Sequence, residues 1–320
     1  MSHLKKIFRG PTKDKAMGEL DGIKVHQFTD NPTKAWSMLK VKQKVKKVTC
    51  LPLDTPIYPD KVRFVCISDT HHQTHKMNPI PNGDVLLHAG DFTFHGEIDQ
   101  TIAFNEFLGS LPHKYKVVIA GNHDITFDEE SLATRPNLKH VFRIDVDKLK
   151  ATLCSKTGKE NPHMWDLLTN CIYLQDSAID IYGLKIYGSP WQPEFCGWGF
   201  NVTRGKDILE KWNLIPKDVD VLLTHGPPIG HGDICFDGLR TGCVELLSVI
   251  QNRVQPKYHI FGHIHEGYGV TTDGTTTFIN ASTCTLRYKP TNPPILFDLP
   301  LPEGYTKEND GAGVSADYKG

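Results

Sequence analysis

The chain of 320 residues has the composition of a folded protein, with 39% hydrophobic residues and 36 basic against 37 acidic side chains. At about 100–200 residues per domain, this length allows one large domain or two small ones, and the composition excludes wholesale disorder. No run approaches the roughly 18 consecutive apolar residues of a membrane helix, and the start MSHLKKIFRG lacks the apolar segment of a secretory signal. We therefore expect a soluble, cytoplasmic protein without a membrane span.

The net charge of −1 conceals two regions of opposite charge. Residues 1–49 hold 12 Lys and Arg against 4 Asp and Glu, a balance of +8, so the rest of the chain holds 24 against 33, a balance of −9. We interpret residues 1–58 as a basic, proline-containing N-terminal arm. Such an arm could bind anionic lipid or nucleic acid, or could be a solvated extension, and charge alone leaves these roles open.

Within the arm, one short helix is predicted near residues 33–44, and regular patterns begin after it. Short apolar runs rich in Val, Ile, Phe and Tyr predict buried strands at 63–68, 84–90, 116–121, 171–174, 184–188, 221–226 and 258–263. Helical patterns cover 98–111, where Pro112 prevents continuation, and also 165–170 and 242–250. The eight cysteines form no C-x-x-C pair, so we expect free thiols.

The alternation of strands and helices predicts an α/β protein. Later strands, within 171–188 and 275–299, follow one another closely and favour hairpins, so we expect a pair of mixed sheets. We divide the chain into the arm, a single folded domain at 59–300 and a flexible C-terminal tail at 301–320.

Five groups of polar residues share one arrangement, in which an apolar strand ends and a ligand-type side chain follows at once. They are Asp69-Thr70-His71, Gly90-Asp91, Gly121-Asn122-His123-Asp124, His225 and Gly262-His263-Ile264-His265. Loops beyond strand ends are where α/β proteins collect binding groups. Carboxylate and imidazole together suit Zn²⁺, Mn²⁺ and Fe ions. Each group alone is weak evidence for a metal site, because a lone histidine beside a strand is more often structural. Five groups in this order predict such a site.

These motifs resemble the signature of the calcineurin-like metallophosphoesterases: D-x-H, G-D, G-N-H-D, a lone H and G-H-x-H. The resemblance covers about residues 62–299. The stretches GDFTFHGE, GSPWQPEFCGWGFN and FGHIHEGYG are similar to the animal metallophosphoesterase domain-containing subfamily. Some members of that subfamily carry Gly at the position of His263, which weakens their activity, so this chain resembles the more active form.

The resemblance implies a four-layer α/β/β/α sandwich with a dinuclear metal site. One ion would be held by Asp69, His71, Asp91 and His265, and the other by Asp91, Asn122, His225 and His263. We expect two divalent ions, Mn²⁺ first, with Fe, Zn, Co or Mg as alternatives. The family further implies attack by a metal-bridging hydroxide, with His123 protonating the leaving oxygen and Asp124 orienting His123. A helix cap is the alternative role for Asp124.

Four residues are predicted as substrate contacts. His95 follows the G-D motif and could touch phosphate or leaving group. Trp191 and Trp198 could form an aromatic wall for a nucleobase, although a loop that buries its own aromatic residues would look the same. Arg204 could supply a bidentate phosphate contact.

The implied function is hydrolysis of small phosphodiesters, with cyclic nucleotides as the expected substrates. A protein phosphatase is less favoured, because residues 90–96 read G-D-F-T-F-H-G and lack the arginine of G-D-x-V-D-R-G. A non-catalytic or weakly catalytic nucleotide-binding or scaffold protein is the alternative from another class. The acidic body argues against a long nucleic acid as substrate.

Overall fold

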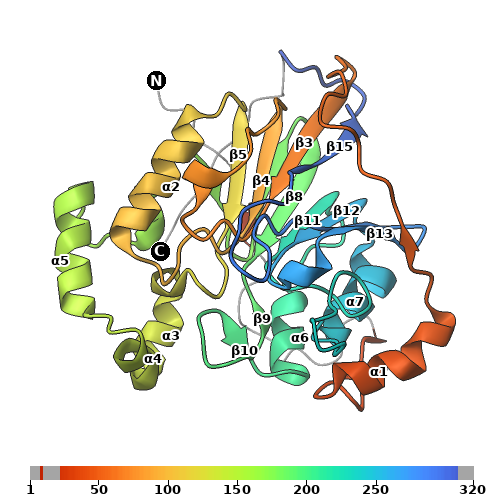
Figure 1. The fold of residues 1–320 in the computed structure, drawn as a ribbon, viewed down its shortest axis with the longest axis horizontal. Coiled ribbons are helices and arrows are strands. Elements are labelled where there is room, and N and C mark those ends of the chain that lie inside the picture. Colours follow the sequence, from red (N-terminus) through yellow and green to blue (C-terminus); the bar gives the residue numbers. More distant parts are fainter. Residues whose placement is uncertain (1–7, 10–21, 309–320) are drawn as a thin grey trace.

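Two mixed β-sheets form the centre of the computed structural model, which describes residues 8–9 and 22–308 (Figure 1). The five-stranded sheet has the order β15-β3-β4-β5-β6. Its strands are β3 (Lys61–Ile67), β4 (Val85–Ala89), β5 (Tyr115–Ile119), β6 (Ile172–Tyr173) and β15 (Ile295–Pro300). Strands β3 to β6 are parallel, and β15 closes one edge antiparallel to β3.

The eight-stranded sheet has the order β1-β7-β8-β11-β12-β14-β13-β2. Its parallel centre consists of β8 (Leu184–Ser189), β11 (Val221–Thr224), β12 (Tyr258–Phe261) and β14 (Thr277–Asn280). Antiparallel strands lie outside this centre: β1 (Phe8–Arg9), β7 (Ser177–Ile181), β13 (Gly269–Thr272) and β2 (Lys46–Lys47). A separate pair joins β9 (Gln192–Pro193) to β10 (Asn201–Val202).

Helices cover the outer faces of both sheets (Figure 1). The α-helices are α1 (Pro32–Leu39), α2 (Ile98–Ser110), α3 (Glu129–Thr134), α4 (Pro136–Val141), α5 (Val146–Thr157), α6 (Lys206–Trp212) and α7 (Val244–Val249). Single turns of 3₁₀-helix are η2 (Lys40–Lys42), η3 (Thr74–Lys76), η4 (Ile125–Phe127), η5 (Met164–Leu167) and η7 (His265–Gly267), and a π-helical turn, η6 (Ile250–Val254), continues α7.

The strand pattern explains this layering, because alternate side chains of a strand point to opposite faces. In β3, Phe64 and Cys66 belong to the core cluster that both sheets share, together with Ile186 and Leu223 of the other sheet. The intervening Val65 belongs instead to the cluster that includes helical residues. The fold is therefore the expected α/β arrangement, with two mixed sheets face to face and helices outside them.

Three expectations about individual elements need correction. Residues 275–299 do not form a hairpin, because β14 pairs with β13 while β15 crosses to the five-stranded sheet. The helix expected at 165–170 is only the single turn η5. The helices α3 to α5 were not predicted, and α3 and α4 span only six residues each, which is too short to show a clear helical period.

The described part of the basic arm packs against the body and is not a solvated extension. Buried Glu245 of α7 accepts hydrogen bonds from the His26 main-chain N–H at 3.2 Å and the Thr29 hydroxyl at 2.9 Å. The Arg240 guanidinium lies 4.5 Å from the ring centre of Trp36 in α1. Farther on, β2 extends the eight-stranded sheet at its edge, so the arm continues the fold across the predicted boundary at residue 58.

The other end of the chain is also attached over the part that is described. Lys307 Nζ lies 2.8 Å from Asp84 Oδ2, and residues 309–320 of the predicted flexible tail lie outside the described residues. Among the described residues, no helix is long and apolar enough to cross a lipid bilayer. All eight cysteines are free thiols, as expected.

Candidate metal centre

The carboxyl ends of the parallel strands meet where the two sheets come together. Strands β3, β4 and β5 are followed directly by the D-x-H, G-D and G-N-H-D motifs, and β11 and β12 by His225 and the G-H-x-H motif. An isolated bridge between Ser68 and Ser282 joins the sheets at this point. Because parallel strands place their carboxyl ends at one edge, the predicted ligands gather in one site.

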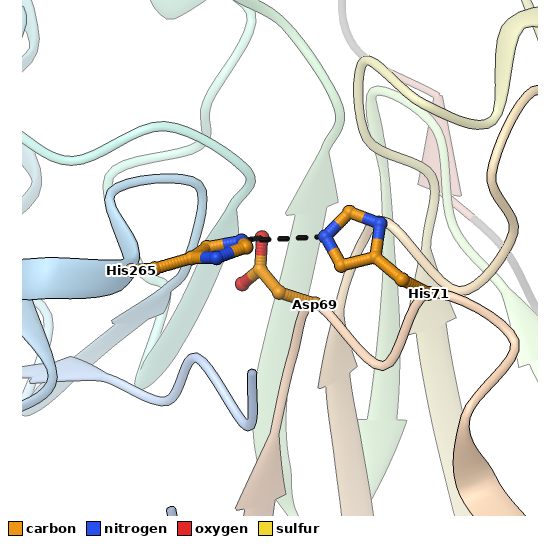
Figure 2. A group of neighbouring side chains, drawn as sticks. All are labelled: Asp69, His71 and His265. Atoms are coloured by element: carbon orange, nitrogen blue, oxygen red, sulfur yellow. Dashed lines mark hydrogen bonds and ion pairs between the residues drawn. The ribbon is translucent and has the colours of Figure 1, made fainter. Parts of the chain in front are cut away.

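Asp69, His71 and His265 form the first cluster of candidate ligands, and their ligand atoms lie within 4.8 Å of one another. His265 Nε2 is 3.4 Å from Asp69 Oδ1 and 3.3 Å from His71 Nε2. Figure 2 shows the two imidazoles directed toward each other beside the Asp69 carboxylate. Such convergence of a carboxylate and two ring nitrogens is the arrangement that a cation stabilises.

Asp91, His225 and His263 form the second cluster, again with ligand atoms within 4.8 Å. His225 Nε2 lies 3.2 Å from Asp91 Oδ2 and 3.0 Å from the side-chain oxygen of Asn122. Asp91 also faces the first cluster, since its Oδ2 is 4.0 Å from His71 Nε2. The structure therefore brings all seven predicted ligands together, with Asp91 between the two clusters.

Main-chain carbonyl groups determine which ring nitrogen of two histidines faces the site. His225 Nδ1 lies 2.8 Å from the Ala89 carbonyl oxygen, and His265 Nδ1 lies 3.0 Å from that of Thr285. Because a carbonyl oxygen can only accept, each Nδ1 carries the hydrogen, and in the neutral ring Nε2 keeps its lone pair. A hydrogen bond from the other ring nitrogen to a carbonyl oxygen is typical of metal-ligating histidines, so the residues present fit a pair of divalent ions.

Backbone geometry at the site is unusual in two ways. Four candidate ligands have left-handed backbone conformations, with φ of 51° at Asp69, 41° at His71, 58° at Asp91 and 66° at His263. Such strain in residues other than glycine is concentrated at functional sites. In addition, a Cβ atom at Gly262 would lie 1.9 Å from Asp69 Oδ2, so only glycine lets β12 approach this carboxylate.

The electrostatics of the site favour bound positive charge. Burial raises the pKa of Asp69 and Asp91, but the surrounding imidazoles outweigh this effect, and both pKa values lie below the ordinary range. Burial lowers the pKa of His71 and His263 to about 3. Burial also opposes protonation of His225, but the nearby carboxylates raise its pKa to about 9. Two ionised carboxylates thus attract either protons or metal ions.

His123 lies beside the ligands, but Asp124 does not orient it. The ring centre of His123 is 4.5 Å from that of His71, and its Nδ1 lies 2.8 Å from the Phe94 carbonyl oxygen. Asp124 instead accepts hydrogen bonds from the main-chain N–H groups of Asp91, Gly121 and Thr93 at 2.9 Å each, and from the Thr93 hydroxyl at 2.7 Å.

The expected role of Asp124 is therefore wrong in both forms. It makes no side-chain capping bond to η4, so the alternative of a helix cap fails as well. Its carboxylate ties the loop after β4 to the loop after β5, and both loops carry candidate ligands. Burial and the charge of Asp91 raise the pKa of Asp124 to about 7, against the effect of its hydrogen-bond donors.

Two of the predicted substrate contacts border the site. The ring of Trp198 lies 4.3 Å from His123 and 5.7 Å from His95, measured between centres. His95 is exposed and its Nδ1 lies 3.2 Å from Glu97 Oε1. Sequence reasoning missed Tyr288, whose ring centre is 4.8 Å from His71. No strand or motif marks Tyr288 in the sequence, because it lies in the connection between β14 and β15.

The other two predicted contacts have structural partners, and we no longer propose them as substrate contacts. Trp191 is buried, and its indole N–H donates to Asp176 at 2.7 Å. The guanidinium of Arg204 donates to the main-chain carbonyl oxygens of Thr241 at 2.5 Å and Gly242 at 3.1 Å. A guanidinium held in this way has its fork directed at the main chain rather than at a phosphate.

The fold and the paired clusters define a class of protein, the metal-dependent phosphoesterases. Comparison of the sequence with family models agrees: residues 62–267 match the calcineurin-like phosphoesterase family. The chain is 52% identical over 287 residues to human metallophosphoesterase domain-containing protein 1, covering 88% of this chain and 86% of that protein. A UPF0046 protein of Caenorhabditis elegans is 50% identical over 282 residues, covering 87% and 70%. The chain belongs to the calcineurin-like metallophosphoesterase family.

Proposed function

We propose that this protein is a two-metal phosphodiesterase that hydrolyses small phosphodiesters, with cyclic nucleotides as the preferred candidates. The observation that carries the proposal is the pair of ligand clusters with Asp91 between them and the His123 ring next to them. Asp69, His71, Asp91 and His265 would hold one ion, and Asp91, Asn122, His225 and His263 the other. Mn²⁺ is our first candidate metal, with Fe, Zn, Co and Mg as alternatives.

The bound ions would supply an activated water and the positive charge that phosphate oxygens need, so the chain itself needs no nucleophile. Its own residues would hold the ions in place and protonate the leaving oxygen. Asn122 would bind its ion through an uncharged amide oxygen, which limits the negative charge that faces an incoming phosphate. The main-chain N–H of His263 donates to Asp69 at 3.0 Å, and the Ser282 hydroxyl donates to it at 2.8 Å, which keeps this carboxylate in place.

His123 would be the general acid. A ring nitrogen of His123 lies within 4.8 Å of the ligand atoms of His71 and Asp91, so its proton can reach an oxygen that leaves from this site. Since Nδ1 faces the Phe94 carbonyl, Nε2 is the nitrogen that would carry the transferable proton.

The alternatives have less support. A protein phosphatase would need a phosphate-binding arginine in the loop after Asp91, where this chain has Phe92 to Gly96. A scaffold that keeps the site only for structure would not need His263 in a strained backbone conformation, with φ of 66°. We therefore keep the non-catalytic nucleotide-binding protein as the second hypothesis, to be decided by activity.

The test combines metal analysis with a substrate panel. We expect purified protein loaded with Mn²⁺ to bind about two ions and to turn over bis-p-nitrophenyl phosphate faster than p-nitrophenyl phosphate. A panel of cyclic nucleotides then identifies the natural class. Asp91→Asn should lose both metal and turnover, whereas Asp99→Asn on the exposed face of α2 should lose neither. Absence of any diester hydrolysis by the fully loaded protein would contradict the proposal and favour the scaffold hypothesis.

A further inference from the structure

The segment that follows α1 carries a row of lysines on the surface of the molecule. Between Asp30 and Asp54 the chain has no acidic residue, and Figure 1 shows α1 and this segment at the outer edge of the molecule, beside β13. We call residues 40–47 the lysine segment. Its lysines are all exposed, and none has an ion-pair partner in the part of the chain that the structure describes. They are Lys40, Lys42, Lys44, Lys46 and Lys47.

A hairpin at residues 234–240, between β11 and α7, exposes apolar side chains. An antiparallel bridge joins its two end residues, and the Cys235 N–H donates to the Leu239 carbonyl at 2.9 Å, so the residues between form a tight tip. Phe236 is 79% exposed at this tip, and Leu239 is 53% exposed. The acidic tip residue, Asp237, accepts a hydrogen bond from the Leu239 N–H at 3.0 Å. Single exposed apolar residues are ordinary, but two large ones on one tip indicate a contact surface.

Contacts of Arg240 place the hairpin beside the arm. Its main-chain N–H donates to the Thr33 hydroxyl at 2.9 Å, and its guanidinium lies over the Trp36 ring of α1. Lys34 of α1 and Leu239 of the hairpin line the same surface depression. Since the lysine segment continues directly from α1, positive charge and exposed apolar side chains are neighbours on this part of the surface.

An acidic partner would have to match both features. Nucleic acid is preferentially contacted by arginine, but every cation of the lysine segment is a lysine, and the Arg240 guanidinium is already paired with Asp233. The aliphatic side chains of Leu239 and of Val41, which is 78% exposed between the lysines, would gain little from a phosphate backbone. At the surface of a bilayer, in contrast, apolar side chains enter the interface while lysines remain among the headgroups.

We propose that the lysine segment and the hairpin form a docking surface for an anionic lipid bilayer. The lysines lie against acidic headgroups, and Phe236 and Leu239 enter the interface between them. Clusters of four to eight basic residues are typical of proteins that bind anionic lipid, and Phe and Leu are typical interfacial side chains. The attachment is peripheral and reversible, and it is independent of the proposed phosphodiesterase activity.

Cosedimentation of the full chain with vesicles tests the surface. We expect binding to phosphatidylcholine vesicles that contain about 30% phosphatidylserine, and not to vesicles of phosphatidylcholine alone. Raising the salt concentration should weaken this binding, because salt screens exposed charges. Combined Lys40→Gln, Lys42→Gln and Lys44→Gln should weaken it roughly 100-fold, at about 5-fold for each lysine near an anionic surface. Phe236→Ala should weaken it roughly 10-fold through lost apolar burial.

Matched controls lie elsewhere on the surface. Combined Lys148→Gln, Lys150→Gln and Lys156→Gln on α5 removes the same charge from three exposed lysines and should leave binding unchanged. Phe195→Ala removes a ring that is 66% exposed in the connection between β9 and β10, and it should also have no effect. Metal content shows that each variant remains folded.

Several results would overturn the proposal. One is equal binding to both kinds of vesicle, and another is equal weakening by the two triple variants, which would indicate an effect of net charge alone. Tighter binding to single-stranded DNA than to the anionic vesicles would assign the lysines to nucleic acid. A dimer that depends on Phe236 in a protein without vesicle binding would assign the hairpin to a second copy of the chain. Aggregation of the Lys40, Lys42 and Lys44 variant with unchanged vesicle binding would mean that these lysines only protect a sheet edge.

Discussion

The two sheets contribute different chemistry to the same site. The five-stranded sheet is followed by every candidate oxygen ligand and by one imidazole: Asp69, Asp91, Asn122 and His71. The eight-stranded sheet is followed only by imidazoles: His225, His263 and His265. Neither sheet could form the site without the other. Two neighbouring buried carboxylates repel each other and are costly to keep ionised. The facing sheet supplies one main-chain N–H, one hydroxyl and the imidazoles that offset this cost.

The largest effect should come from forcing the two sheets apart at the site. In Gly262→Ala, the new Cβ would lie 1.9 Å from Asp69 Oδ2 and 2.2 Å from Ser68 Oγ, so the strand must shift. We expect loss of bound metal, activity near background and a loss of about 1–3 kcal/mol in the free energy of unfolding. Gly109→Ala in α2 meets only the end of the Asn170 side chain and should remain active. A metal-loaded, active Gly262→Ala protein would contradict this view of the interface.

The next largest effect should separate chemistry from ligand binding. His123→Ala should keep its metal content, because both clusters retain their ligands, while kcat falls by roughly 10²–10⁴ as general-acid catalysis is lost. His140→Ala, on the exposed end of α4, is the matched histidine control and should change neither quantity. Loss of metal from the His123 variant would show that this ring is a ligand of the five-stranded side rather than a proton donor.

A smaller effect should follow from a single hydrogen bond between the two sheets. Ser282, which follows β14 of the eight-stranded sheet, donates to Asp69 of the five-stranded sheet at 2.8 Å. We expect Ser282→Ala to weaken metal binding about 10- to 100-fold, the usual cost of removing a group that orients a ligand. Titration with Mn²⁺ measures the change, and exposed Ser110→Ala in α2 serves as control. Unchanged affinity would mean that the Ser282 hydroxyl is not needed to hold Asp69 in place.

The smallest effect on chemistry should come from Asp124, whose hydrogen bonds join only loops of the five-stranded sheet. In Asp124→Asn, an NH₂ group replaces one of the two carboxylate oxygens, both of which accept hydrogen bonds. We expect the free energy of unfolding to fall by about 1–3 kcal/mol. Since Asp124 has no contact with the His123 ring among its hydrogen bonds, the pH dependence of kcat should keep its shape in the metal-loaded variant. A shift in the acidic limb of the kcat–pH profile would instead indicate that Asp124 orients His123.

Much of the site could be predicted because its residues follow the strands directly. A buried apolar run followed by Asp, Asn or His determines both the strand and the place of the side chain. Reasoning from residue type and position failed for Trp191 and Arg204, because composition cannot tell which aromatic or guanidinium group has a partner inside the protein.

Motifs and local periodicity were enough to predict the family, the order of the ligands and the strands that carry them, since these depend on spacing along the chain. The partners of the individual side chains, in contrast, follow from the three-dimensional fold. Asp124 hydrogen-bonds to the loops that carry the ligands and not to His123, and the Phe94 carbonyl is the partner of the His123 ring. Tyr288 lies beside His71 at the metal centre. The physical reason is that such contacts join residues far apart in the chain, and their energies depend on distance and direction, which no spacing in the sequence encodes.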